Sequence, residues 1–222
     1  MARPAKPRMT VHAPTREALL ETSAEIFAHR GFAGTTVREI CERAGANVAA
    51  IHYHFGDKAG LYSEVLKHAL QCARQKYPPH LGTNARSTPE ERLRAFIESF
   101  LLRIFDEGRH AWHGKLMARE MVEPTAALDR LVQEEIRPMA LILHGIVREL
   151  LGTDATDESV RLCSLSVVSQ CLFYQQCRPV LQRLFPKSKS NLRAPNPLAE
   201  HITNFSLAAL QQRARPRRKR AS

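Results

Sequence analysis

The stretch from residue 47 to 58 concentrates small and polar side chains that can contact a polar surface. Asn47 can cap a short helix there. Val48, Ile51 and Phe55 would lie on its buried face. The small and polar residues are left on the opposite face, where they suit base edges and thymine methyl groups in a DNA major groove. The candidates for these base contacts are Asn47, Val48, Ala49, Ala50 and His52.

A second group of side chains is better placed for phosphate oxygens, which fix the register of a complex without reading its sequence. This group is Thr35, Thr36, Arg38, Tyr53, His54 and Lys58. His52 and His54 also raise the question of a metal site, but their i, i+2 spacing on a helix splays the two rings apart. We therefore expect no metal and no other cofactor.

Two short helices joined by a tight turn must position these residues. Thr36 and Glu39 predict a capping box that starts a helix at Val37. In this motif the Thr hydroxyl accepts a hydrogen bond from an otherwise unpaired backbone amide, and the Glu side chain accepts one from the backbone amide of the capping residue. Gly45 can take the left-handed conformation that ends it. The predicted buried stripe of this helix is Val37, Ile40, Cys41 and Ala44.

Further helices flank this pair on both sides. Gly56 ends the second short helix and Asp57 caps the next, which runs on to about residue 76. Upstream, Thr15 can cap a helix that Gly31 closes, with Leu20, Ala24, Phe27 and Ala28 facing inward. Two helices with a Gly-containing turn, the second with small and polar groups outward, are typical of a helix-turn-helix. The alternative is an ordinary three-helix core with no role in DNA binding.

The same residues match a known family in both type and spacing. GF at 31, TTVREI at 35, AG at 44, YHF at 53, DK at 57 and LY at 61 closely resemble the N-terminal domain of TetR-type bacterial transcriptional regulators. The resemblance implies that the residues matching Thr36, Tyr53, His54 and Lys58 contact phosphate.

The net charge of +11 suggests a polyanionic partner, but most of it lies at the two ends of the chain. Residues 1–13 and 213–222 together supply nine of the eleven excess positive charges and contain no acid. The folded body is therefore close to neutral. The basic arm could reach into a minor groove or remain a solvated tail, and the basic tail could add DNA affinity or only solubility.

Several classes of protein are disfavoured. No run of about 18 apolar residues occurs and the N-terminus lacks the apolar segment of a signal peptide, so we expect a cytoplasmic protein with no membrane partner. The five cysteines show no CxxC spacing and are interpreted as reduced and structural rather than as a redox switch. An enzyme would rest on His110, His113 and Glu120 or on Cys177, yet no GxSxG, P-loop, Rossmann or HExxH pattern occurs.

The predicted fold class is all-α, because no run has the period of two that is typical of strands. We expect a disordered arm over 1–13, a helix-turn-helix domain over 14–60, a helical ligand-binding and dimerisation domain over 61–212, and a disordered tail over 213–222. Beyond the loop that follows Pro79, the predicted helices cover residues 90–107, 109–122, 125–151 with an interruption at Pro138, 156–185 and 197–213.

The last two predicted helices indicate a homodimer. The helix over 156–185 is apolar nearly all round, and the helix over 197–213 carries a separate apolar stripe. Together they could form an isologous four-helix contact, unless both are buried within one chain. A two-fold axis would present two helix-turn-helix units, one from each chain, to a pseudo-palindromic operator in double-stranded DNA. We call each of these units a reading head.

The C-terminal half also resembles the branch of TetR regulators with a CecR-type ligand domain. The resemblance rests on LMAREMVEPTAALDRLV from residue 116, IRP from 136 and SVVSQCLFY from 166. It implies a sensor for a small-molecule effector and does not name that effector. The candidate effector contacts are Trp112, Met117, Arg119, Glu120, Gln170, Phe173, Tyr174 and Cys177. Alternatively, Arg119 and Glu120 form a surface or interhelical ion pair, and the aromatic residues belong to the core.

The leading hypothesis is a sequence-specific, homodimeric, ligand-released transcriptional repressor. Effector binding would move the helix over 61–76 and change the distance between the two reading heads. The alternatives are a nonspecific architectural DNA-binding protein and, less favoured, a helical enzyme.

Overall fold

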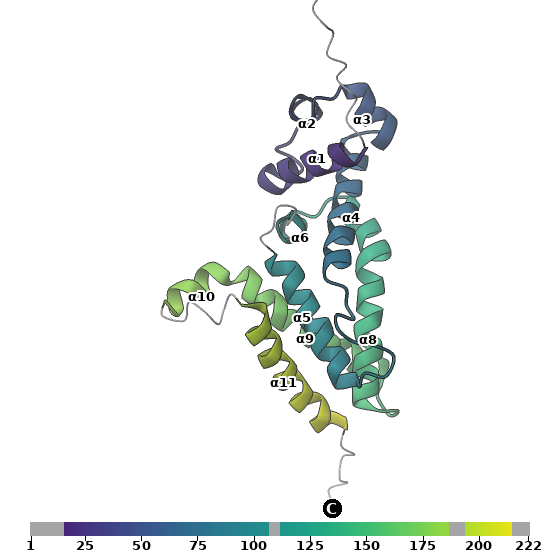
Figure 1. The fold of residues 1–222 in the computed structure, drawn as a ribbon, viewed down its shortest axis with the longest axis vertical. Coiled ribbons are helices and arrows are strands. Elements are labelled where there is room, and N and C mark those ends of the chain that lie inside the picture. The colour runs from purple at the N-terminus through teal and green to yellow at the C-terminus, as the bar shows by residue number, and fades with distance from the viewer. Residues whose placement is uncertain (1–15, 107–111, 187–193, 215–222) are drawn as a thin grey trace, which may run out of the picture.

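The chain folds into helices joined by short loops, with no strand in the part that the structure describes (Figure 1). The structure is a computed structural model, and it describes residues 16–106, 112–186 and 194–214. The expected arm over 1–13, the Thr15 cap and the tail beyond residue 214 lie outside these ranges. The prediction of an all-α fold is confirmed.

Four helices form the N-terminal end of the molecule. They are α1 (Arg16–Arg30), α2 (Val37–Ala44), α3 (Val48–Phe55) and α4 (Lys58–Lys76). The predicted caps are confirmed, since Thr36, Asn47 and Asp57 each accept a hydrogen bond from the backbone amide three residues on. Gly45 ends α2 with a φ of 63°. The predicted return hydrogen bond from the Glu39 side chain to the backbone of Thr36 is wrong, because the Glu39 carboxylate pairs with Arg30 at 2.8 Å.

A first hydrophobic core holds these helices together. Ile40 and Ile51 from the two short helices are fully buried against α1 and the first half of α4. The Phe27 and Tyr62 rings meet edge to face with 4.9 Å between their centroids. Leu116 and Leu131 from further along the chain also belong to this core, so the N-terminal helices are packed directly against the C-terminal half.

The C-terminal half contains α5 (Pro89–Phe105), α6 (Trp112–Val122), α7 (Ala127–Leu131), a π-helical turn η1 (Val132–Ile136), α8 (Arg137–Leu151), α9 (Asp157–Gln176), α10 (Arg178–Leu184) and α11 (Pro195–Ala214). α5 packs on α8, α9 and α11 around a second hydrophobic core. Because α11 continues to Ala214, the first two residues of the predicted tail are helical, and that boundary is wrong.

Two prolines change the predicted helices. The segment over 125–151 is not interrupted at Pro138, because the chain widens into η1 just before it and Pro138 sits in the first turn of α8. A proline has no N–H for the helix ladder and its ring crowds the carbonyl four residues earlier, which a wider turn accommodates. The single helix predicted over 156–185 is wrong, because the chain breaks at Cys177, two residues before Pro179.

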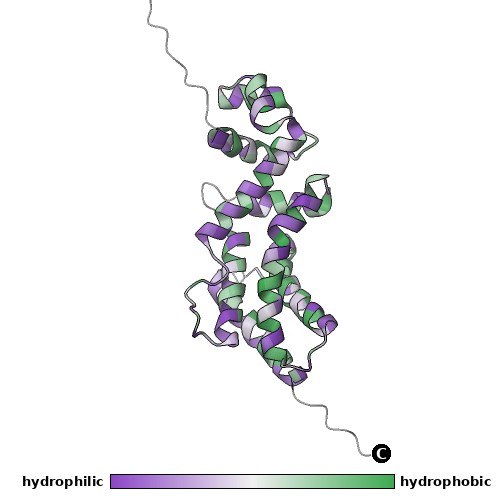
Figure 2. Ribbon diagram, turned by 90° about the vertical axis from the view of Figure 1, so that its right-hand side faces the viewer, coloured by the Kyte–Doolittle hydropathy of each residue, from purple (hydrophilic) through white to green (hydrophobic). Residues whose placement is uncertain are grey.

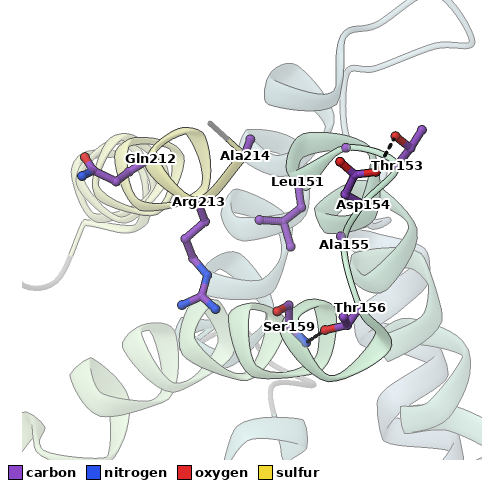
Figure 3. A pocket seen from close by; sticks show the side chains of 10 residues that line it. Leu151, Thr153, Asp154, Ala155, Thr156, Ser159, Gln212, Arg213 and Ala214 are labelled. Carbon is purple, nitrogen blue, oxygen red and sulfur yellow. Dashed lines mark hydrogen bonds between the residues drawn. The ribbon is translucent and has the colours of Figure 1, made fainter. Parts of the chain in front are cut away.

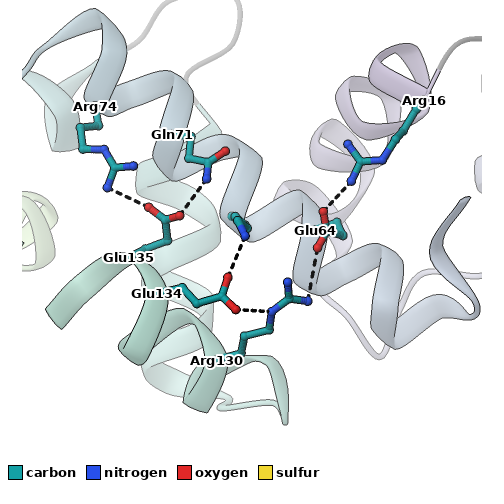
Figure 4. Close-up of polar contacts among 8 residues, drawn as sticks. Arg16, Glu64, Gln71, Arg74, Arg130, Glu134 and Glu135 are labelled. Carbon is teal, nitrogen blue, oxygen red and sulfur yellow. Dashed lines mark hydrogen bonds and ion pairs between the residues drawn. The ribbon is translucent and has the colours of Figure 1, made fainter. Parts of the chain in front are cut away.

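α4 connects the N-terminal helices to α7 and η1. Its N-terminal half lies in the first core, and its polar side chains bind α7 and η1 along the rest of its length (Figure 4). Glu64 contacts Arg16 of α1 at 2.5 Å and Arg130 of α7 at 3.3 Å. Lys67 pairs with Glu134 at 2.7 Å. A displacement of α7 and η1 would therefore be transmitted to α4 and to the N-terminal helices.

The C-terminal helices leave apolar side chains uncovered. Figure 2 shows hydrophobic residues interleaved with hydrophilic ones along the helices. The large exposed hydrophobic residues of this half are Met121, Val122, Leu141, Ile142, Leu162, Leu165, Phe173, Val180, Leu184, Phe185 and Phe205. Among the described residues, no helix is both long enough and apolar enough to cross a lipid bilayer.

Candidate nucleic-acid interface and effector site

The outward face of α3 is free of contacts with the body of the molecule. Ile51 and Phe55 are buried, whereas Ala49, His52, Tyr53 and His54 are exposed, Tyr53 by 85%. The prediction that Val48 faces inward is wrong, because Ala46 and Ala50 pack against the first core and leave Val48 46% exposed. Val48 and Ala49 can therefore reach a thymine methyl group, whereas half-buried Ala50 presents less surface than expected.

His52 has a defined hydrogen-bonding state on this face. Its Nδ1 lies within hydrogen-bond distance of the Gly56 backbone oxygen. A carbonyl oxygen only accepts, so Nδ1 must donate, and the neutral ring then presents Nε2 as an acceptor. An acceptor in the major groove suits the exocyclic amino group of adenine or cytosine.

Some of the side chains predicted to contact phosphate are exposed, and others already make contacts within the chain. Thr36, Arg38, Tyr53 and His54 are exposed, although Arg38 also pairs with Glu42 at 2.9 Å on the same helix. The half-buried Lys58 lies with its Nζ 4.4 Å from the centre of the Phe32 ring.

Thr35 requires a correction. Its side chain is 1% exposed and its hydroxyl donates to the Gly31 oxygen at 2.7 Å. The prediction that this side chain contacts phosphate is wrong, because the turn between α1 and α2 uses the hydroxyl internally.

Four of the predicted effector residues lie where α6 meets the first core. Trp112 and Met117 pack against that core. Arg119 donates to the Ala28 and His29 oxygens at the end of α1, at 3.1 and 2.6 Å. Glu120 is fully buried and accepts hydrogen bonds from the Tyr62 hydroxyl and from the Thr125 amide and hydroxyl. Arg119 and Glu120 thus bind separate partners, so the alternative of an ion pair between them does not describe their contacts.

The other four predicted effector residues lie on or just after α9. Gln170 donates to the Ser206 hydroxyl of α11 at 3.2 Å, and Tyr174 is partly buried against the second core. Phe173 points outward and is exposed, and Cys177 is the C-cap of α9. The two groups of predicted residues therefore have different neighbours, and the structure does not gather them around one cavity.

Two described cavities lie elsewhere. The larger, of about 730 Å³, is a polar depression between the turn after α8, the start of α9 and the end of α11, with Arg213 and Asp154 on its rim (Figure 3). The smaller, of about 440 Å³, lies between the loop before α5 and the face of α5 that bears Arg94. Neither cavity is lined by a predicted effector residue.

Sequence reasoning missed a buried polar pair inside the C-terminal half. Arg103 is 6% exposed and His113 is 8% exposed. Burial, followed by the positive charge of Arg74, lowers the pKa of Arg103 to about 10. Burial, followed by the charge of Arg103, lowers the pKa of His113 to about 4. One signal was available, because Arg103 follows Phe96 and Phe100 at helical spacing on the inward stripe of α5.

Comparisons with known proteins agree with this geometry. Residues 19–65 match the family described as bacterial regulatory proteins, tetR family, and residues 89–210 match the C-terminal domain of the HTH-type transcriptional dual regulator CecR. The chain is 26% identical to CecR of Shigella flexneri over 178 residues, covering 76% of this chain and 79% of that protein. It is 24% identical to the transcriptional repressor NicS of Pseudomonas putida, covering 89% and 93%.

Solved structures share the fold. A putative transcriptional regulator from Pseudomonas aeruginosa PAO1 superposes with a TM-score of 0.65 at 22% identity, covering 90% of this chain and 93% of that one. AibR, solved in complex with isovaleryl coenzyme A and operator DNA, superposes with a TM-score of 0.62 at 14% identity, covering 85% and 96%. The chain belongs to the TetR family and is a DNA-binding transcriptional regulator whose C-terminal half is a CecR-type domain.

Proposed function

We propose that this regulator is a homodimeric repressor that leaves its operator when a small molecule binds its C-terminal half. The observation that carries the proposal is that each chain presents two uncovered faces, the polar face of α3 and an apolar face on α9 and α11. The first face fits a major groove, and the second fits another copy of the same face.

The apolar face consists of three large exposed side chains on α9 and one on α11, and the two helices contact each other. On α9, Leu162, Leu165 and Phe173 are exposed and follow one another at helical spacing. On α11, Phe205 is exposed beside the ring of His201. Exposed apolar rows on adjacent helices are costly for an isolated chain. We infer that α9 and α11 of two chains pack into a four-helix contact around a two-fold axis.

Release of DNA follows from the position of α4. This helix carries the reading head at one end and binds α7 and η1 through ion pairs along its length. An effector that favours a different separation of the C-terminal helices would tilt α4 in both subunits and change the distance between the reading heads. Such coupling is worth about 1–3 kcal/mol in typical regulators.

Footprinting of the purified protein on the DNA upstream of its own gene tests this proposal. We expect a protected pseudo-palindrome whose half-sites lie about one turn of DNA, or a multiple of it, apart. Light scattering should give twice the 25.1 kDa mass of one chain. Equal affinity for unrelated DNA sequences would support the architectural alternative and overturn the proposal.

A further inference from the structure

We propose that Arg103 and His113 form the anion-binding end of the effector site, and that the effector is a small organic carboxylate. The inference rests on the proposed function, since it names the chemical class of the ligand that releases the operator. It places the binding group in the interior of the C-terminal half, between α5 and α6, rather than in either of the described cavities.

Arg103 is a buried cation without a carboxylate partner in the described chain. Its Nη1 donates to the Tyr77 oxygen and to the Ser99 hydroxyl, and both of these partners are neutral. No hydrogen bond within the described residues uses its Nε or Nη2. A buried charge is costly unless it is paired, and a guanidinium pairs best with a carboxylate that takes two parallel hydrogen bonds.

Two described acidic residues on elements close to Arg103 in the chain or in the fold are engaged by other cations. Glu135 of η1 is buried and binds Arg74 at 2.9 Å and the Gln71 amide at 2.9 Å (Figure 4). Asp106, at the end of α5, pairs with Lys76 at 2.7 Å. Arg74 carries the same charge as Arg103 and acts against it. The guanidinium of Arg103 lies over the Phe100 ring, 5.6 Å from its centre, but no carboxylate among the described residues pairs with it.

His113 supplies a second incomplete group at the same place. It lies close enough to Arg103 for the two charges to interact, and its ring forms a hydrogen bond with the Arg103 backbone oxygen. Its Nδ1 is buried and has no hydrogen-bond partner in the described chain. A neutral ring that donates through Nε2 leaves Nδ1 as an acceptor, so a hydroxyl or amine N–H beside the carboxylate would complete it.

The packing around the pair explains why no open cavity is present there. A Cβ added to Gly114, the neighbour of His113, would lie 3.0 Å from the Ile104 oxygen and 3.3 Å from the Gln175 amide nitrogen. α6 thus lies directly against α5 and α9 at this point. A ligand reaches Arg103 only when these helices separate. The ligand would therefore bind the separated state more tightly than the packed state, and this difference in affinity is what an effector needs to shift the equilibrium between the two states. α6 also holds α1 through Arg119, so its displacement reaches the reading head.

Matched carboxylates and amides test the charge requirement on the full chain. Benzoate and hexanoate are compared with benzamide and hexanamide at equal ionic strength. The melting temperature and the affinity for the footprinted operator are measured in each. We expect each carboxylate, near saturation, to raise the melting temperature by about 3–5 °C and to weaken operator binding at least 5-fold, and the amides to do neither.

Two variants assign the effect to Arg103. Arg103→Met keeps the length of the side chain without its charge. The Tyr77 oxygen retains the Ser99 hydroxyl as a donor. We expect this variant to bind the operator as the wild type does and to lose both carboxylate responses. Arg103→Lys keeps the charge without the fork, and should bind benzoate about 10-fold more weakly. It provides the answer if Arg103→Met fails to fold.

The outcomes separate this inference from the proposed function. Equal responses to amides and carboxylates, no response to either carboxylate, or an unchanged benzoate response in both variants would each overturn the anion site. None of these results would affect operator binding by the wild-type protein. Failure of the wild-type protein to select an operator would instead contradict the proposed function, whatever the carboxylates do.

Discussion

The Tyr62 hydroxyl of α4 donates a 2.9 Å hydrogen bond to the Glu120 carboxylate of α6, and both groups are buried. Burial, followed by this hydrogen bond, raises the pKa of Tyr62, so the hydroxyl keeps its proton and remains the donor. The adjacent Arg119 binds the end of α1. The contact therefore ties α4, which carries the helix-turn-helix, to α6, the helix that contains His113 and lies beside Arg103 of α5.

Tyr62→Phe should lower the free energy of unfolding by about 2 kcal/mol, because the buried carboxylate of Glu120 loses a donor that water cannot replace. Urea unfolding at one fixed protein concentration measures the change. Tyr53→Phe is the matched control, since the Tyr53 side chain is exposed and its change should have no effect on stability. Equal stabilities of the wild type and Tyr62→Phe would show that the hydrogen bond contributes nothing.

Arg119→Met should loosen the last turn of α1, because the Ala28 and His29 oxygens lose their donors. Hydrogen exchange should accelerate over residues 27–35, where the Gly31 and Thr35 amides bind the Phe27 and Phe32 oxygens. Exchange in α5 and α11 should not change. Arg94→Met on the exposed face of α5 is the control for loss of an arginine. Unchanged exchange over residues 27–35 would contradict a bracing role for Arg119.

His52→Ala should alter operator preference rather than overall affinity. Loss of an acceptor in the major groove should cost about 1–3 kcal/mol at the base pair that His52 contacts and little elsewhere. Binding-site selection on the variant measures the preference at each position. Lys58→Met is the comparison, since a lost phosphate contact weakens all sequences alike and lowers the salt slope by about 1. Identical selected sites for His52→Ala and the wild type would remove His52 from base recognition.

Leu165→Glu should yield a monomer of 25.1 kDa by light scattering, because a charge at the centre of an apolar contact between two chains cannot be paired. Operator affinity should fall with it, since one reading head engages only one half-site. Val122→Glu provides the control, because Val122 is an exposed apolar residue at the end of α6 and belongs to neither helix of the proposed contact. A dimer that survives Leu165→Glu would move the interface to another face.

The N-terminal helices could be predicted closely from the sequence because their boundaries are local. Thr36, Asn47 and Asp57 each cap a helix through their own side chain, and Gly45 and Gly56 end one, so neighbouring residues decide where each helix stops. The inward orientation predicted for Val48 failed because the position of the first core decides which side of the first turn is covered. The phosphate contact predicted for Thr35 failed for a similar reason, since its hydroxyl donates a hydrogen bond across the turn to the Gly31 oxygen.

The contacts of the candidate effector residues on α6 could not be predicted because they join distant parts of the chain. Arg119 binds a carbonyl oxygen 91 positions away, and Tyr62, one of the donors to Glu120, lies 58 positions away. Neither separation leaves a periodic pattern in the sequence. Arg103 could have been found as a charge on an apolar stripe. That it has no carboxylate partner among residues 16–106, 112–186 and 194–214 becomes visible only once Glu135 and Asp106 are placed with their own cations.

His113 should make the stability of the protein depend on pH between about 4 and 6.5. Its pKa in the folded chain is lowered to about 4, from an ordinary value of 6.5, chiefly by burial. Over this range the unfolded chain binds the proton and the folded chain does not. The contribution of His113 to stability is therefore fully present above pH 6.5, and the free energy of unfolding falls by about 3 kcal/mol as the pH approaches 4.

In His113→Gln this part of the pH dependence should disappear, and urea unfolding from pH 4.5 to 7 measures it. Because other groups titrate in both proteins, the difference between the two curves is the quantity that decides. Parallel curves would mean that the His113 ring is not kept neutral in the folded protein.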